Sequence, residues 1–367
     1  MGFDIMKDGD SHLMLKEIHE QPDAIARTLE RCKPDALRIA ELYPLKSFDL
    51  IYITGSGTSY HAGLAGQYAM ATITKTFTSV IPSSEFRYWV PSSAGKKTMV
   101  FTVSQSGESV DVLNAAKFAR DSGSTVVAIT NTQGSSLTKL AHSTMLIHAG
   151  EERAVTATKT YTAQLVAMFT IALACAEKGQ LVERDTLSVL NKTMLEVPRY
   201  VKDTLSLCES QVNSLADKLK SNKFIFLLGS GPNYATSLEG ALKLKESSEI
   251  VAEGFATREF IHGPMQLISQ GTPIIVFMPH SEGKEETLRT IANFKKLGAR
   301  VILVSCFEHD DSVYTDLFEC IKVESKVEEI FTPIVYIVPI QLFAFHMAIK
   351  RGLDPDRPEK LSKVVRF

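Results

Sequence analysis

The residues most able to do chemistry form two hydroxyl-rich loops, each directly after an apolar, strand-like segment. The first loop is Ser104-Gln105-Ser106-Gly107-Glu108-Ser109, which follows residues 98–103, and the second is Gly55-Ser56-Gly57-Thr58-Ser59, which follows residues 51–54. Backbone N–H groups at a helix N-terminus and serine hydroxyls can together hold a phosphate without a lysine. Either loop alone is also typical of an ordinary turn. Two such loops on one sheet predict a site for a small phosphorylated molecule.

A lysine and a glutamate in a helix-like segment are candidates for acid–base chemistry. Lys243 and Glu246 are three positions apart and therefore share one face of a helix. Such a pair is either a surface ion pair of little energetic value or a carboxylate base steadied by an ammonium group. The spacing alone leaves both interpretations open.

Two further residues have side chains suited to proton transfer or nucleophilic attack. His262 stands immediately before a Gly-Pro turn, where it is either structural or a proton carrier, because its charge changes near neutral pH. Lys363 lies near the C-terminus between apolar residues. It is either a solvated lysine or a mobile one that closes over the site, where loss of water would favour the neutral amine and attack on a sugar carbonyl.

An internal duplication organises the elements that must position these residues. Three strand-like segments in the first half align with three in the second at an offset of 174 to 175 positions, namely 49–57, 99–103 and 122–129 with 223–231, 274–278 and 297–304. Each half has the order strand, helix, strand, helix, strand, which is typical of a parallel sheet covered by helices. In the second half, Pro279-His280-Ser281-Glu282-Gly283-Lys284 replaces the hydroxyl-rich loop. We therefore expect one phosphate site per chain, beyond the carboxyl ends of the first sheet's strands.

The composition limits the class of protein. A chain of 367 residues with 44% hydrophobic and 22% charged residues is typical of a globular protein of two domains, and a net charge of -2 argues against nucleic-acid binding. The five scattered cysteines have no CxxC spacing and predict thiols in a reducing compartment. The polar start is unlike a signal peptide, and we interpret the apolar runs 162–176 and 333–349 as buried helices. These features predict a cytoplasmic protein without membrane contact.

The sequence pattern predicts four segments. They are an N-terminal helical segment (1–48), a phosphate-binding domain (49–190), a second domain with Glu246 and His262 (191–350), and a C-terminal active-site tail (351–367).

Ordered motifs over nearly the whole chain resemble the tandem sugar isomerase (SIS) domain family. The motifs are Lys16-Glu17-Ile18-His19-Glu20-Gln21-Pro22, Gly57-Thr58-Ser59-Tyr60, the Ser104–Ser109 loop, Val155-Thr156-Ala157-Thr158-Lys159, Lys243-Leu244-Lys245-Glu246, His262-Gly263-Pro264 and Leu361-Ser362-Lys363. The resemblance is to the isomerase half of glucosamine-6-phosphate synthase and to stand-alone SIS-type glucosamine-6-phosphate deaminases. It implies an α/β protein with two tandem SIS domains, each a mainly parallel, flavodoxin-like sheet with helices on both faces.

The resemblance also implies a role for each candidate residue. Ser104, Gln105, Ser106 and Ser109 would bind the phosphate. Thr58 and Ser59 would lie near the sugar, and Val155 and Ser362 would also line the substrate site. Glu246 would move a proton between C1 and C2 of the open-chain sugar with support from Lys243. His262 would open the ring from the neighbouring subunit of a homodimer, and Lys363 would contact the open-chain sugar or form an imine. No metal or other cofactor is implied.

We expect the chain to interconvert glucosamine 6-phosphate with fructose 6-phosphate and free ammonia. Asp354-Pro355-Asp356 and the Leu361-Ser362-Lys363-Val364 tail look more like the deaminases, Ser56 stands where the synthase often has cysteine, and Met1-Gly2 supplies no cysteine nucleophile. The alternatives are the isomerase domain of glutamine–fructose-6-phosphate aminotransferase, a deglycase acting on a related fructosamine 6-phosphate, and a non-catalytic sugar-phosphate sensor. The combination of Glu246, His262 and Lys363 argues against a sensor.

Overall fold

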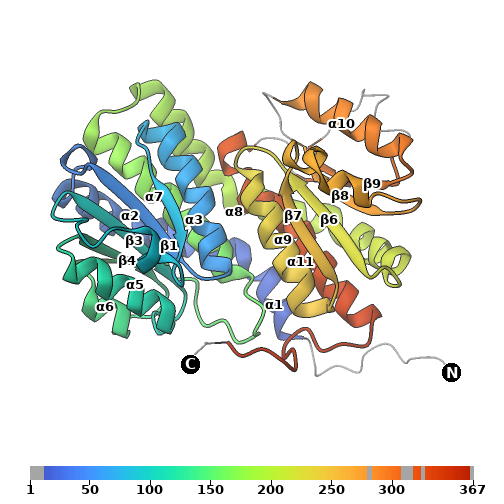
Figure 1. Cartoon of the computed structure of the whole chain (residues 1–367), viewed down its shortest axis with the longest axis horizontal. Helices are drawn as coiled ribbons and strands as arrows, with labels where there is room; N and C mark the ends of the chain where they lie inside the picture. Colours follow the sequence, from blue (N-terminus) through green and yellow to red (C-terminus); the bar gives the residue numbers. More distant parts are fainter. Residues whose placement is uncertain (1–11, 279–282, 307–316, 324–326, 364–367) are drawn as a thin grey trace.

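Two five-stranded sheets, each parallel throughout, form the frame of the protein (Figure 1). The computed structural model describes residues 12–278, 283–306, 317–323 and 327–363. The strand order is β2-β1-β3-β4-β5 in the first sheet and β10-β9-β8-β6-β7 in the second. Read from the other edge, the second order repeats the first, with β6 in the place of β1 and β8 in the place of β3. This confirms the predicted α/β fold and its duplication; the loop at 279–282, expected to lack the hydroxyl cradle, lies outside the described residues.

The three strands predicted in each half are the central strands of each sheet. The first sheet contains β1 (Leu50–Gly55), β2 (Ser79–Pro82), β3 (Thr98–Ser104), β4 (Thr125–Thr130) and β5 (Ser143–Leu146), and the second contains β6 (Phe224–Gly229), β7 (Val251–Ala256), β8 (Pro273–Phe277), β9 (Arg300–Ser305) and β10 (Glu319–Lys322). The sequence analysis missed the four edge strands. Three of them have only four residues, and all four carry polar residues or glycine, so their apolar pattern is weak.

Helices separate the two sheets and cover their outer faces (Figure 1). They are α1 (Leu13–His19), α2 (Gln21–Leu42), α3 (Thr58–Ala69), α4 (Phe86–Trp89), α5 (Val110–Asp121), α6 (Ser136–Leu140), α7 (Lys159–Gly179), α8 (Arg184–Leu219), α9 (Asn233–Ser248), α10 (Lys284–Lys296) and α11 (Thr332–Lys350), with short turns η1 (Leu45–Ser47), η2 (Met70–Thr74), η3 (Glu259–His262), η4 (Pro264–Leu267) and η6 (Glu329–Phe331). The 36-residue α8 joins the two halves, and the domain boundary expected at 190 falls inside it.

Alternating strand residues show that each sheet is buried on both faces. In β6, Ile225 and Leu227 join a core shared by both halves, whereas Phe226 and Leu228 join a separate cluster on the outer face. The shared core is filled by the layer of helices between the sheets, in which α3 of the first half packs against α9 of the second. This contact matters for function because both helices begin at the carboxyl ends of central strands.

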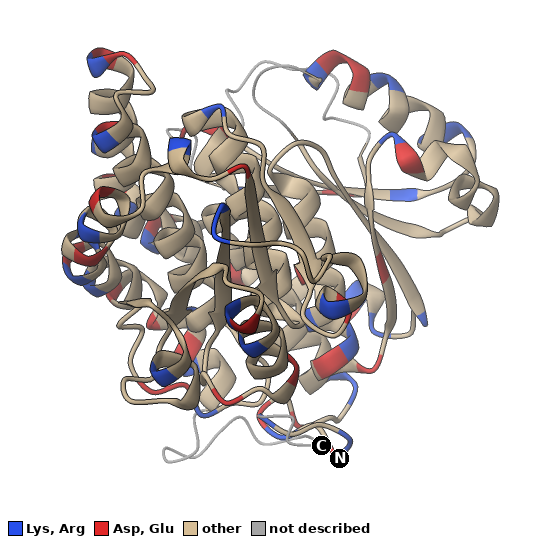
Figure 2. Ribbon diagram, turned by 60° about the vertical axis from the view of Figure 1, so that its left-hand side comes forward, with Lys and Arg blue, Asp and Glu red and all other residues tan. Residues whose placement is uncertain are grey.

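Two helices are long and apolar enough to cross a membrane by length and composition alone. They are Lys159–Gly179 (α7) and Glu329–Lys350 (η6 with α11), and 94% of the apolar window of each is buried inside the protein. This burial is what core helices show, as predicted for both runs. Outside the core, acidic and basic residues are interspersed along the helices in the view of Figure 2.

Candidate active site

A cavity of about 260 Å³ lies where the two hydroxyl-rich loops meet α9 and the C-terminal tail. Ten of the twelve predicted site residues line it, namely Thr58, Ser59, Ser104, Gln105, Ser106, Ser109, Val155, Glu246, Ser362 and Lys363. Its other lining residues are Ser56, Gly57, Val103, Val112, Glu152, Ala157 and Leu361. Segments more than 300 positions apart in the sequence thus enclose one space.

One part of the cavity has the features of an anion cradle at the start of α5. Ser104 Oγ accepts a hydrogen bond from the N–H of Gly107 (3.1 Å), and Ser106 Oγ accepts one from the N–H of Glu108 (3.2 Å). Gly107 has φ +65°, and a side chain there would collide with Ser135. Ser109 is the N-cap residue of α5, but within the described chain its hydroxyl caps no backbone N–H. The hydroxyls and the positive end of the helix dipole therefore converge on this part of the cavity.

The second loop places Thr58 and Ser59 in the first turn of α3. The hydroxyl of Thr58 accepts a hydrogen bond from Lys243 Nζ (3.1 Å) and donates one to Glu239 (3.0 Å). Ser59 Oγ accepts a hydrogen bond from the side-chain amide of the buried Gln164 (3.0 Å). Both hydroxyls are therefore fixed by residues from other helices, which holds this loop in place beside the cavity.

Lys243 lies behind Glu246 and is buried completely. Its Nζ is 2.7 Å from Oε2 of Glu246 and 3.2 Å from Oε1 of Glu239. Burial alone would lower the pKa of Lys243, but the two carboxylates outweigh it, so the pKa is raised and the ammonium persists at all physiological pH values. This excludes the surface ion pair that the spacing had left open. Glu246 keeps 22% of its side chain exposed and lines the cavity, as a base must in order to reach a substrate.

Glu239 and His61 belong to the same network and were missed by the sequence analysis. Glu239 is fully buried, which alone would raise its pKa, but Lys243, His61 and Thr58 outweigh burial and lower it. His61 Nδ1 lies 2.7 Å from Oε2 of Glu239, and because a carboxylate only accepts, this nitrogen carries the proton. The spacing of Glu239, four positions before Lys243 on one helix face, was the available signal.

Lys363 is docked in the cavity rather than extended into solvent. Its Nζ donates to Oε2 of Glu152 (2.6 Å) and to the carbonyl of Ala154 (2.7 Å). Glu152 has a fully buried side chain and was not predicted, because nothing distinguishes it from its polar neighbours in the sequence. The tail therefore closes one side of the cavity in this structure.

His262 does not line this cavity. It is exposed at the end of η3 and lies on a separate open cavity with Arg258, Glu286 and Arg289. Of the twelve predicted residues, ten line the cavity and Lys243 contacts Glu246 behind it. His262 is the remaining one, and a single chain does not place it at this site.

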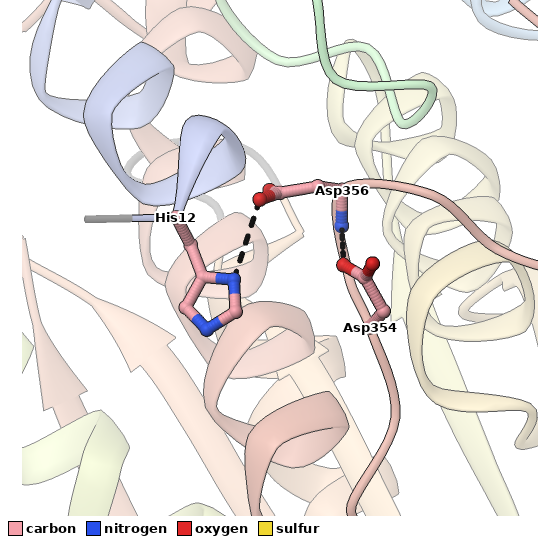
Figure 3. Close-up of side chains that lie close together, drawn as sticks. All are labelled: His12, Asp354 and Asp356. Carbon is pink, nitrogen blue, oxygen red and sulfur yellow. Dashed lines mark hydrogen bonds and ion pairs between the residues drawn. The ribbon is translucent and has the colours of Figure 1, made fainter. Parts of the chain in front are cut away.

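His12, Asp354 and Asp356 form a cluster near the start of α1, with His12 facing the Asp356 carboxylate (Figure 3). Both Asp356 oxygens accept backbone hydrogen bonds, from the N–H groups of Met14 (2.7 Å) and Leu13 (2.9 Å). Asp356 thus caps α1 through the N–H groups that the helix itself leaves unpaired. We interpret the cluster as a clamp between the tail and α1.

The duplicated parallel sheets and the hydroxyl cradle at a helix start define a duplicated α/β protein with a candidate anion site. The SIS domain family model matches residues 45–174 and 218–351, and the chain belongs to this family, with two SIS domains.

Relatives with known names match almost the full chain. Glutamine–fructose-6-phosphate aminotransferase (isomerizing) from Thermococcus kodakarensis is 38% identical over 359 residues, and the enzyme of that name from Aquifex aeolicus is 39% identical over 362 residues. Each alignment covers 98% of this chain and 58% of the relative, so the chain spans a little over half the length of these relatives. These names support one of the alternatives, the isomerase domain of glutamine–fructose-6-phosphate aminotransferase, more than they support the expected deaminase.

Solved structures share the fold. The C-terminal domain of glucosamine-fructose-6-phosphate aminotransferase from Francisella tularensis has a TM-score of 0.89 and 29% identity, and covers 96% of this chain and 100% of that domain. A glucosamine-6-phosphate deaminase from Thermotoga maritima has a TM-score of 0.73 at 22% identity, covering 96% and 99%, which shows a common fold alone.

Proposed function

We propose that this chain is a phosphosugar isomerase that takes part in forming glucosamine 6-phosphate from fructose 6-phosphate, as the isomerase part of an aminotransferase of the kind named among its relatives. The observation that carries the proposal is that one cavity contains both the anion cradle of α5 and the carboxylate of Glu246, with Lys243 behind it. A binding protein needs the cradle, whereas a buried ammonium placed against a cavity-facing carboxylate suits proton transfer.

In the proposed reaction the sugar phosphate binds the cradle and the open-chain carbons lie against Glu246. The carboxylate removes a proton from C1 of the ketose or its imine and returns it to C2, so that no proton is gained or lost overall. Lys243 keeps its charge and orients the carboxylate through the 2.7 Å contact. Lys363, which is also on the cavity, would meet the oxygen or nitrogen at C2 or form an imine there.

Ring opening needs a group that donates and accepts a proton near neutral pH, and no histidine is among the described residues that line the cavity. We assign it to His262 of a second copy in a homodimer, because His262 is exposed and separate from the cavity in its own chain. An imidazole is suited to this step because it can donate and accept a proton near neutral pH.

We also propose a cytoplasmic location. No disulfide joins the five cysteines, all of which lie in the described part of the chain, and thiols of this kind are typical of a reducing compartment.

The test is to incubate the purified chain with fructose 6-phosphate and, separately, with glucosamine 6-phosphate, and to measure sugar phosphates and ammonia. We expect fructose 6-phosphate to be converted to its aldose, and no ammonia to be released from glucosamine 6-phosphate. Release of fructose 6-phosphate and ammonia in equal amounts from glucosamine 6-phosphate would instead establish the deaminase. Binding without turnover of either sugar would overturn the enzymatic proposal and favour a sensor.

A further inference from the structure

We propose that Glu152 is a positioning residue that holds Lys363 and the C-terminal tail in the cavity. This inference rests on the proposed function for the role of Lys363, but the contact itself does not. The carboxylate of Glu152 and the ammonium of Lys363 are 2.6 Å apart and come from segments 211 positions apart. Lys363 has 24% of its side chain exposed, whereas the Glu152 side chain is fully buried, so the glutamate is the fixed partner of the pair.

The surroundings of Glu152 keep it ionised and in one orientation. Besides Lys363, its oxygens accept hydrogen bonds from the Thr160 hydroxyl (2.6 Å) and from the N–H groups of Thr158 (2.9 Å) and Thr160 (3.1 Å). Burial alone would raise the pKa of Glu152, but Lys363 and these donors outweigh burial and lower it. Because the acceptor is preformed, docking of the tail costs little further ordering of the loop.

The loop that carries Glu152 is itself fixed by α1. Glu17 accepts hydrogen bonds from the N–H groups of Arg153 (2.6 Å) and Ala154 (3.2 Å), and the N–H of Val155 donates to the carbonyl of Asp356 (3.0 Å). The side chain of the same Asp356 caps α1, and it also faces His12, as Figure 3 shows. The loop therefore contacts α1, α1 contacts the tail, and the tail contacts the loop. The contact of Lys363 with Glu152 adds a second link between the tail and the loop.

The position of Lys363 decides what it offers to a ligand. Two of its three N–H groups have acceptors on the loop, Glu152 and the Ala154 carbonyl, and among the described residues the third has none. That third N–H is free to meet a sugar oxygen in the cavity. Without Glu152, the lysine keeps one neutral acceptor, the carbonyl of Ala154, and loses the one charged contact that the described part of the tail makes at the cavity.

The experiment compares Glu152→Gln with Glu151→Gln. The two changes remove the same charge at adjacent positions, but Glu151 is exposed and does not line the cavity. We expect Glu152→Gln to lower kcat/KM for the phosphosugar at least tenfold and Glu151→Gln to change it less than twofold. Equal activity of the two variants would overturn the proposal.

A double-mutant cycle shows whether Glu152 acts through Lys363. If it does, adding Glu152→Gln to Lys363→Met changes the residual activity less than twofold, because the lysine is already absent. Losses that multiply in the double variant would show that Glu152 acts independently, and would contradict the proposal.

Hydrogen exchange of the folded protein gives a readout that needs no activity. Peptides covering residues 354–363 should exchange faster in Glu152→Gln and also in Lys363→Met, which reaches the pair from its exposed side should Glu152→Gln fold poorly. Unchanged exchange in Lys363→Met would overturn the proposal that the Glu152–Lys363 contact holds the tail in the cavity. If the wild-type protein turns over no phosphosugar, the proposed function fails, and the exchange result still decides the contact.

Discussion

Lys243 and Glu246 form an ion pair in which only one partner reaches the cavity. Their charged atoms are 2.7 Å apart, yet Lys243 has no exposed side-chain surface, whereas Glu246 retains 22%. The ammonium therefore acts as a fixed charge, and the carboxylate is the member that can exchange a proton with a ligand. The difference in exposure assigns a supporting role to Lys243 and a reacting role to Glu246, although both lie on the same face of α9.

Replacement of Glu246 by glutamine should abolish most turnover without preventing binding. The variant keeps the size and the contact to Lys243 but removes the base, and proton transfer by a positioned side chain is typically worth about 10²- to 10⁴-fold in rate. We expect kcat to fall by that factor while affinity for the sugar phosphate, measured by calorimetry, stays within a few-fold. Glu253→Gln, at an exposed carboxylate, is the control. Unchanged turnover in Glu246→Gln would remove Glu246 from the mechanism.

Replacement of Lys243 by methionine should destabilise the fold strongly. The change leaves the buried Glu239 carboxylate without its ammonium, and breaking a buried pair in this way typically costs about 3–5 kcal/mol. Lys245→Met is a matched control two positions along α9, because Lys245 is 45% exposed and its contact with Glu253 is 3.5 Å. We expect the control to change the free energy of unfolding in urea by less than about 1 kcal/mol. Equal effects of the two changes would contradict the buried network.

Acid should destabilise the protein through Glu239 and Glu152. The pKa of each is lowered in the folded state from a reference value of 4.5, so below that value the unfolded chain binds more protons than the native protein. The stabilisation is therefore complete above the unfolded-state pKa and is lost as the pH falls through the lower native value. Unfolding in urea across this range should show a free energy that declines with acid, by at most about 1.4 kcal/mol per pH unit and per group. Glu239→Gln should flatten the decline, and an unaltered slope would exclude Glu239 as a source.

Mixed dimers should reveal whether His262 acts across an interface. His262→Asn and Glu246→Gln should each be inactive alone, but a dimer with one chain of each kind would contain one intact site. Random exchange at equal amounts should restore about a quarter of wild-type activity, because half of the dimers are mixed and half of their sites are intact. Failure to recover activity, with chain exchange verified by mass spectrometry, would argue that His262 serves its own chain or has no role in the site.

The sequence determined the features that depend on local pattern. The central strands, the hydroxyl cradle before α5 and the pairing of Lys243 with Glu246 each follow from periodicity or spacing within one segment, and the repeat offset follows from comparing the two halves of the sequence. The edge strands were missed because three of them are only four residues long and all four contain polar residues or glycine, and each pairs with a single neighbouring strand of its sheet.

Only the tertiary structure decided which charged or titratable side chains, far apart in the sequence, form pairs. His61 and Glu239 are 178 positions apart, and Glu152 and Lys363 are 211 apart, yet each pair is in contact. The residue types are common on protein surfaces, and although Glu239 has a helical spacing to Lys243 and Lys363 lies in a candidate motif, no local pattern pairs them with His61 and Glu152. Their roles come from burial between two packed halves, where an ionised side chain persists only with a partner, and which partner it finds depends on how the chain folds.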